Sequence, residues 1–177
     1  SSSLANIDIL ILNHGFNPKQ MIDSNDINKA IEINSLSHWR LIEIFEHLSL
    51  ANNLNKDNSK EVWVNTSEAE IQIAFSPVYE ITKRLIGELV SLKKSNLLME
   101  KRNSFIVKKL ILGPFKSELN PQGIMSAAFV ARKIIQKAEK ETYLIIVSPN
   151  PITYLIMPLV EFIRMLYSRI IKKIYSN

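Results

Sequence analysis

Tyr79 and Lys83 are the two residues whose types and spacing most clearly fit a chemical task. They follow Pro77 in a stretch with apolar residues at helical spacing, and a four-residue step puts the phenol and the ammonium on one helix face. A nearby positive charge favours phenolate, so Lys83 is expected to lower the pKa of Tyr79, as a proton donor to a carbonyl requires. Ser67 lies twelve residues before the tyrosine, at the end of a strand-like run, and can hydrogen-bond the same carbonyl oxygen.

A pair of this kind is common on helix surfaces, so the order of the surrounding elements carries more weight. Apolar runs predict strands at 7–12, 61–65, 105–112 and 143–147, and apolar residues at helical spacing predict helices at 27–45, 77–94, 123–138 and 159–174. Strands that alternate with helices predict an α/β fold with a parallel sheet covered on both faces.

Five short motifs in this order resemble those of the short-chain dehydrogenase/reductase family, over essentially the whole chain. Residues 7–15, which end in Asn13, His14 and Gly15, resemble the family's fourth strand and its N-N-A-G motif. Residues 112–117 resemble its P-G-x-x-x-T turn. The helix asparagine and the serine of the family's catalytic tetrad, and its Y-x-x-x-K pair, are matched by Asn34, Ser67, Tyr79 and Lys83.

The resemblance implies a Rossmann-like, doubly wound parallel sheet reduced to the family's strands 4–7. It would form one partial NAD(P)-binding domain over residues 1–177, ending in an amphipathic helix at 158–175. The implied reaction is hydride transfer between NAD or NADP and a small alcohol or carbonyl substrate. Tyr79 would pass the proton, Lys83 would depress its pKa and hold the nicotinamide ribose, Ser67 would orient the substrate, and Asn34 would hold a relay water.

The same resemblance implies that the cofactor is bound by Asn13, Gly15, Gly113 and Ser117, together with Tyr79 and Lys83. The chain departs from the family's N-N-A-G and P-G-x-x-x-T motifs at four positions. Leu12 and His14 replace an asparagine and an alanine, and Leu112 and Ser117 replace a proline and a threonine, the last change keeping the hydroxyl. We interpret His14 as an ordinary turn residue rather than a catalytic one.

The glycine-rich turn that holds the cofactor pyrophosphate in this family has no counterpart here. The chain contains only four glycines, and none of them forms a G-x-G-x-x-G cluster. By comparison with the family, the first three strands are missing, and the strand at 7–12 is therefore expected to be an exposed edge. The rival hypothesis is a non-catalytic relative or part of one that acts as an interaction or membrane-associated module.

Composition excludes several other classes. The chain has no cysteine and three scattered histidines, so we expect neither a disulfide framework nor a metal site. The net charge of +5 comes from cations spread over several segments without interleaved aromatics, so nucleic acid is not an expected partner. The N-terminus lacks the features of a signal peptide, and a cytoplasmic location is expected.

Two surfaces are candidates for contacts. The helices that carry Asn34 and Tyr79 form the usual dimer surface of the family, so a homo-oligomer is expected there. The last helix places Leu159, Phe162 and Leu166 on one face and Glu161 and Arg164 opposite. Its apolar face is predicted to pack on the sheet or cover the pocket, and the alternative is peripheral contact with a membrane interface.

Overall fold

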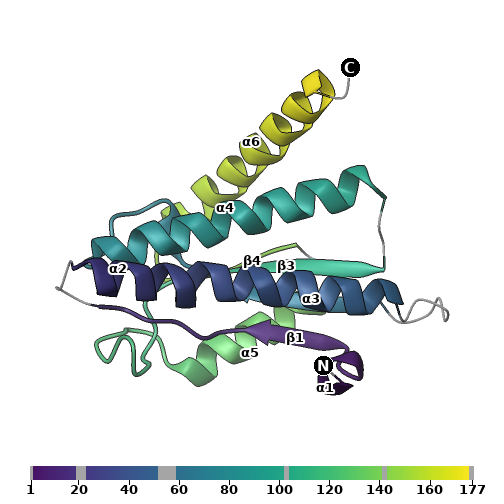
Figure 1. Cartoon of the computed structure of the whole chain (residues 1–177). Coiled ribbons are helices and arrows are strands. Elements are labelled where there is room, and N and C mark those ends of the chain that lie inside the picture. The colour runs from purple at the N-terminus through teal and green to yellow at the C-terminus, as the bar shows by residue number, and fades with distance from the viewer. Residues whose placement is uncertain (1, 19–22, 52–58, 102–103, 141–142, 176–177) are drawn as a thin grey trace.

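The computed structural model describes residues 2–18, 23–51, 59–101, 104–140 and 143–175 (Figure 1). The elements along the chain are α1 (Ser2–Ala5), β1 (Ile9–Leu12), α2 (Ser24–Ile31), the π-helix η1 (Glu32–Leu36), α3 (Ser37–Ala51), β2 (Lys60–Asn65), the 3-10 helix η2 (Glu68–Glu70), α4 (Pro77–Met99), β3 (Phe105–Leu112), α5 (Ala127–Ala138), β4 (Leu144–Val147) and α6 (Pro151–Tyr175).

The strands form one parallel sheet in the order β1-β2-β3-β4, which confirms the predicted α/β fold. β2 and β3 lie in the centre, and Val62 pairs with Leu10 on one side and with Val107 on the other. Nearly every residue of these two strands is buried, including Lys108 and Lys109, as expected for strands that are covered on both faces. The carboxyl ends of all four strands therefore lie at the same edge of the sheet.

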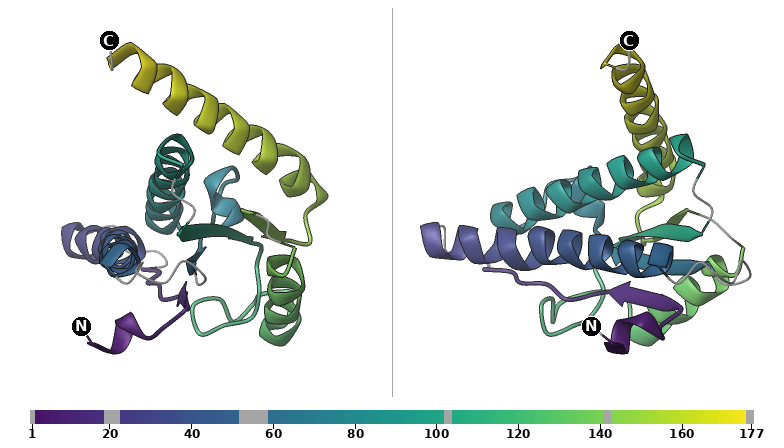
Figure 2. Two further views of the ribbon diagram at one scale, coloured as in Figure 1. Left: turned by 90° about the vertical axis from the view of Figure 1, so that its right-hand side faces the viewer. Right: turned by 45° about the vertical axis from the view of Figure 1, so that its right-hand side comes forward.

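Helices cover the two faces of this sheet unequally (Figure 2). α3 and α4 lie on one face over a core that includes Phe45, Ile86 and Val107. α5 lies on the opposite face, where Val130 packs against Leu110 and its neighbours. α6 starts beside β4, contacts α4, and extends away from the body of the molecule.

β1 is an edge strand, as the sequence predicts, and β4 lies at the other edge. Among the described residues β1 pairs only with β2, and the side chains of Ile9 and Ile11 on its outer face are exposed. Leu12, which points to the other face, is buried against α3 and α4.

Local capping explains where the helices differ from the predicted ranges. Asp23 caps α2 by accepting a hydrogen bond from the backbone N–H of Asp26 at 2.7 Å. Ser126 caps α5 in the same way, so that helix begins later than predicted. α6 begins at Pro151, and Pro158 lies inside it rather than at its start, because Asn150 accepts a hydrogen bond from the N–H of Ile152 and starts the helix earlier.

The orientation of α6 reverses the expected packing. Its polar residues Thr153 and Glu161 are buried against the protein, whereas Leu159 and Phe162 are 57% and 59% exposed. The prediction that the apolar face packs on the sheet is therefore wrong, because buried ion pairs hold the opposite face inward. No helix within the described ranges is long and apolar enough to cross a bilayer.

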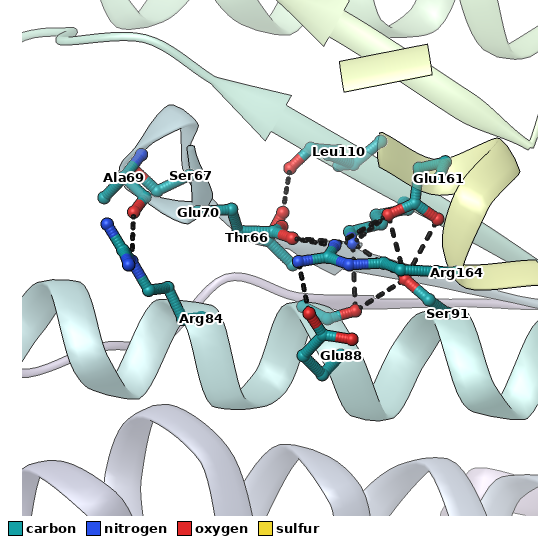
Figure 3. A network of polar contacts seen from close by, with 12 residues as sticks. Thr66, Ser67, Ala69, Glu70, Arg84, Glu88, Ser91, Leu110, Glu161 and Arg164 are labelled. Carbon is teal, nitrogen blue, oxygen red and sulfur yellow. Dashed lines mark hydrogen bonds and ion pairs between the residues drawn. The ribbon is translucent and has the colours of Figure 1, made fainter. Parts of the chain in front are cut away.

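A buried ionic network joins the sheet, η2, α4 and α6 (Figure 3). The Lys109 ammonium, at the centre of β3, lies 2.8 Å from a carboxylate oxygen of Glu70 and 2.7 Å from one of Glu161. Arg164 contacts the same two carboxylates at 2.8 and 2.9 Å. Arg164 also contacts the exposed carboxylate of Glu88 at 2.6 Å. The two cations are thus paired with two buried carboxylates and one exposed one, in a place where an unpaired charge would be very costly.

Backbone and hydroxyl groups of α4 complete this network. The Lys109 ammonium donates to the carbonyl oxygen of Gly87 at 2.9 Å, and the Ser91 hydroxyl donates to Glu161 at 2.9 Å. Gly87 also makes room for Glu70, since a Cβ at this glycine would lie 2.1 Å from a Glu70 carboxylate oxygen. The network therefore fixes η2 against α4, and with it the turn that carries Ser67.

Because Gly87 and Glu70 lie so close together, the effect of Gly87→Ala on stability should change sign when the Glu70 side chain is removed. Gly87→Ala should destabilise the protein, by about 2 kcal/mol or more, because the Glu70 carboxylate is held by Lys109 and Arg164 and cannot move away. In a Glu70→Ala background the clash disappears, and Gly87→Ala should instead stabilise helix α4 by roughly 0.5–1 kcal/mol. Chemical denaturation of the four proteins measures both effects, and equal effects in the two backgrounds would contradict the packing.

Candidate functional site

The ends of β1 and β2 are linked directly at the carboxyl edge of the sheet. The side-chain amide of Asn65, the last residue of β2, donates to the side-chain oxygen of Asn13, which follows β1. Ligands of open parallel sheets bind at this edge, and the two asparagines lie where the motifs predict cofactor contacts. Asn65 itself was not predicted, since a lone asparagine at a strand end carries no recognisable signal.

Ser67, Tyr79 and Lys83 converge at the same edge. Ser67 follows β2 and caps η2, accepting a hydrogen bond from the N–H of Ala69 at 3.2 Å. Tyr79 and Lys83 lie on the first turns of α4, and the Lys83 ammonium is 5.6 Å from the centre of the Tyr79 ring. The structure thus brings together the three residues that the spacing singled out.

The pKa of Tyr79 is raised by burial, and a hydrogen bond from the Ser67 hydroxyl only partly opposes this. The prediction that Lys83 lowers this pKa is therefore wrong: the pKa is raised, because burial disfavours the phenolate and Lys83 is not among the groups that shift it. The contact with Ser67 is the one that favours the phenolate here.

Lys83 is almost completely buried. Its ammonium donates to the backbone carbonyl of Asn65 at 3.0 Å, the one hydrogen bond that it makes to the described residues. Burial lowers the pKa of Lys83 to about 8, and the negative charge of Glu70 works against this decrease. The remaining N–H donors are chemically able to bind hydroxyl groups.

Asn34 lies in the π-helix η1 and is completely buried. Its side-chain amide donates to the carbonyl of Phe16 at 2.8 Å and to the Thr82 hydroxyl at 2.9 Å, while its oxygen accepts from the N–H of Phe16 at 2.7 Å. Asn34 therefore joins the segment after β1 to α4, next to Lys83. π-Helical turns often occur at functional sites, and this one turns the asparagine toward α4.

His14 and His38 form a stacked pair that sequence reasoning missed. Their ring centres are 4.0 Å apart with an interplanar angle of 6°, and Nε2 of His14 lies 2.7 Å from the Ser37 hydroxyl. Burial, then the charge of Lys83, lower the pKa of His38 to about 3, so this ring is neutral. Neither of its ring nitrogens makes a hydrogen bond of normal geometry. Residues 14 and 38 are too far apart in sequence for any spacing rule to pair them.

The predicted glycine and serine contacts lie on loops around this edge. Gly15 is close to Asn34 and to Leu119 from the loop after β3, where a Cβ would meet their side chains at 3.4 and 3.3 Å. Gly113 packs against the turn after β4, and its Cβ would lie 2.7 Å from Pro149. The Ser117 hydroxyl accepts from the N–H of Asn120 at 3.2 Å, so it shapes its own turn and makes no described contact with the tetrad.

Solved structures share this architecture. A short-chain dehydrogenase from Burkholderia cenocepacia J2315 in complex with NADP superposes with a TM-score of 0.72 at 14% identity, covering 95% of this chain and 70% of that one. A short-chain dehydrogenase from Sphingobium yanoikuyae in complex with NADPH gives a TM-score of 0.70 at 16% identity, covering 94% and 68%. The chain has the fold of the short-chain dehydrogenases. The resemblance drawn from the motifs is thereby confirmed at the level of the fold.

A curated relative is much more similar in sequence. Monoglucosyldiacylglycerol epimerase from Synechocystis sp. is 46% identical over 170 residues, which cover 96% of this chain. These residues make up 40% of that relative, so the chain spans less than half of its length. No family model matches the chain.

The burial of Lys83 predicts a pH dependence of stability. Its folded pKa of about 8 lies below the ordinary value of 10.5, so below pH 8 the folded protein bears the full cost of a buried ammonium. As the pH rises toward 10.5 this cost disappears, and the stability advantage of Lys83→Met over the wild type should shrink by about 3 kcal/mol. Denaturation at a series of pH values measures this difference in stability. Lys116→Met, which replaces an exposed lysine, is the control. A difference that does not change with pH would contradict the buried position.

Proposed function

We propose that this chain supplies the catalytic residues of a nicotinamide-dependent enzyme that interconverts an alcohol and a carbonyl. The specific reaction would be epimerisation at a hydroxyl-bearing carbon of the sugar in a glycosyl diacylglycerol. The observation that carries the proposal is the convergence of Ser67, Tyr79 and Lys83 at the carboxyl edge of the sheet. The similarity to an epimerase of a glucosyl lipid supports the finer form.

Each residue has a role that follows from its contacts. Tyr79 exchanges a proton with the substrate oxygen, since its phenol lies beside a hydroxyl that favours the phenolate. Ser67 orients that oxygen from the turn after β2. Lys83, whose pKa is lowered to about 8, is positioned to take up or release the proton near neutral pH. Asn34 fixes the helix beside Lys83 and would hold a relay water through its backbone, because its side chain is already engaged.

The residues at this edge fit the nicotinamide half of NAD or NADP. Asn13, Gly15, Gly113 and Ser117 lie on the loops at the same strand ends, and Lys83 retains N–H donors beyond the one that it gives to Asn65. When bound, the cofactor accepts and returns a hydride. The two superposed dehydrogenases described above contain NADP or NADPH, which supports a nicotinamide cofactor without deciding between the two.

Epimerisation requires such chemistry at an ordinary carbinol carbon. The C–H bond next to a hydroxyl is not acidic, so a base alone does not invert the centre. Removal of the hydrogen as hydride, with the hydroxyl proton passing to Tyr79, gives a planar ketone. Return of the hydride to the opposite face, with the proton returned by Tyr79, gives the epimer, and the reaction is redox-neutral overall.

Two further properties are proposed with the activity. A homo-oligomer would form through α3 and α4, where Ile44, Ile81 and Leu92 are exposed apolar residues. A cytoplasmic location is the expectation from the sequence, and peripheral membrane contact, the alternative that the sequence left open, suits a lipid substrate.

The test uses the complete protein as its gene encodes it. Calorimetry with NAD and NADP measures cofactor affinity, and epimerisation of a detergent-solubilised glucosyl diacylglycerol measures turnover. Tyr79→Phe should lower kcat by about 100-fold or more because it removes the proton donor, and should leave cofactor affinity nearly unchanged. Lys83→Met should weaken both.

Tyr167→Phe, at an exposed tyrosine of α6, is the matched control and should retain full turnover. Turnover by Tyr79→Phe at the wild-type rate would contradict the assigned role. Failure of the complete protein to bind either cofactor would overturn the proposal and favour the non-catalytic alternative.

A further inference from the structure

α6 is amphipathic in the opposite sense to a helix that packs on a protein core. The residues turned toward the body include Thr153, Met157 and Glu161, of which two are polar. The outer side carries a continuous apolar stripe whose members are 46–77% exposed: Ile152, Leu155, Leu159, Phe162, Ile163, Leu166 and Ile170. The inner side is thus mixed, with Met157 beside the buried Thr153 and Glu161, and an exposed apolar stripe opposite it is expected where the outer face meets a second apolar phase.

The rotation of α6 about its axis is fixed by buried charges. Glu161 is 2% exposed, and burial alone would raise its pKa, but Lys109 together with the hydrogen bonds from Ser91 and Arg164 lowers the pKa below its ordinary value. Arg164, one turn later, contacts Glu70 and Glu161 at 2.8 and 2.9 Å (Figure 3). Rotating the apolar stripe inward would expose this network and leave Lys109 without Glu161. The outward stripe is therefore built into the fold.

Exposed apolar side chains also lie in the loop that precedes α4, close to the candidate site. The side-chain amide of Gln72 donates to the Thr153 hydroxyl at 2.8 Å, which joins the loop before α4 to the start of α6. In that loop Ile73 is 93% exposed and Phe75 is fully exposed, and Tyr79 follows four residues after Phe75. Exposed apolar side chains of this loop therefore add to those of α6 close to the start of that helix.

The charges on α6 indicate what this surface contacts. Glu161 is the only acidic residue of the helix and is buried in the network, whereas Arg169, Lys172 and Lys173 are exposed. Every exposed charge of α6 is therefore positive. Tyr154, Tyr167 and Tyr175 are also exposed, and such side chains suit the boundary between water and hydrocarbon.

We propose that the outer face of α6, with Ile73 and Phe75, docks on a lipid bilayer that contains anionic headgroups, and holds the mouth of the site against it. The proposal deepens the proposed function, since a glycosyl diacylglycerol would then reach Tyr79 from the membrane in which it lies. Apolar side chains enter the interface, and the terminal cations contact the anionic headgroups.

Vesicle co-sedimentation of the complete protein tests the proposal. The probes are vesicles of phosphatidylcholine alone and with about 30% phosphatidylglycerol. Leu159→Gln with Phe162→Gln should lower partitioning about ten-fold or more on both. Arg169→Gln with Lys173→Gln should lower it roughly 25-fold on the anionic vesicles only. The matched control is Phe129→Gln with Ile135→Gln on α5, which removes a similar exposed apolar area from the other side of the sheet.

The α6 variants should retain epimerisation of the detergent-solubilised substrate while losing it for substrate in vesicles. Unchanged partitioning in both α6 variants would overturn the docking surface. A smaller assembly of the α6 variants than of the wild type in light scattering would also overturn it, because a second protein chain would then cover the stripe. Absence of turnover in detergent by the wild type would overturn the proposed function alone, since partitioning is measured without it.

Discussion

The ammonium of Lys109, buried in the middle of the central strand β3, constrains most of this structure. It is completely buried and lies within 2.8 Å of two carboxylates, one from the turn after β2 and one from α6. Because a buried cation without these partners would cost several kcal/mol, on the order of 3–5, the sheet fixes both Glu70 and Glu161. The position of η2 and the rotation of α6 follow from that requirement.

The same network reaches the candidate site electrostatically. Glu70 lies three residues after Ser67 and is the charge that opposes the decrease in the pKa of Lys83. Burial and Glu70 together leave that pKa at about 8, close to the range in which a proton relay operates. Glu70 thus contributes both to holding the turn that carries Ser67 and to setting the pKa of Lys83.

The sequence predicted what short-range patterns encode. Apolar runs gave the strands, and the four-residue step of Tyr79 and Lys83 gave the helix face that meets Ser67. Contacts between distant segments were not predictable: nothing in the spacing of His14 and His38 indicates that they stack, and Lys109 in a central strand gives no sign of which carboxylates surround it. The periodicity of α6 identified its two faces correctly, but periodicity alone does not determine which face is buried. The buried ion pairs of Glu161 and Arg164 determine which face is buried.

We propose that the residues at the carboxyl ends of the strands serve the oxidation and then the reduction of one carbinol carbon, with Tyr79 moving the proton. Deuterium at the reacting carbon of the glycolipid tests it most directly. If the complete protein transfers a hydride and returns it, the epimer should keep the deuterium at that carbon, and mass spectrometry of the product should show no loss to water. Replacement of the deuterium by solvent hydrogen would mean that the carbon is deprotonated instead, and would contradict this account of the site.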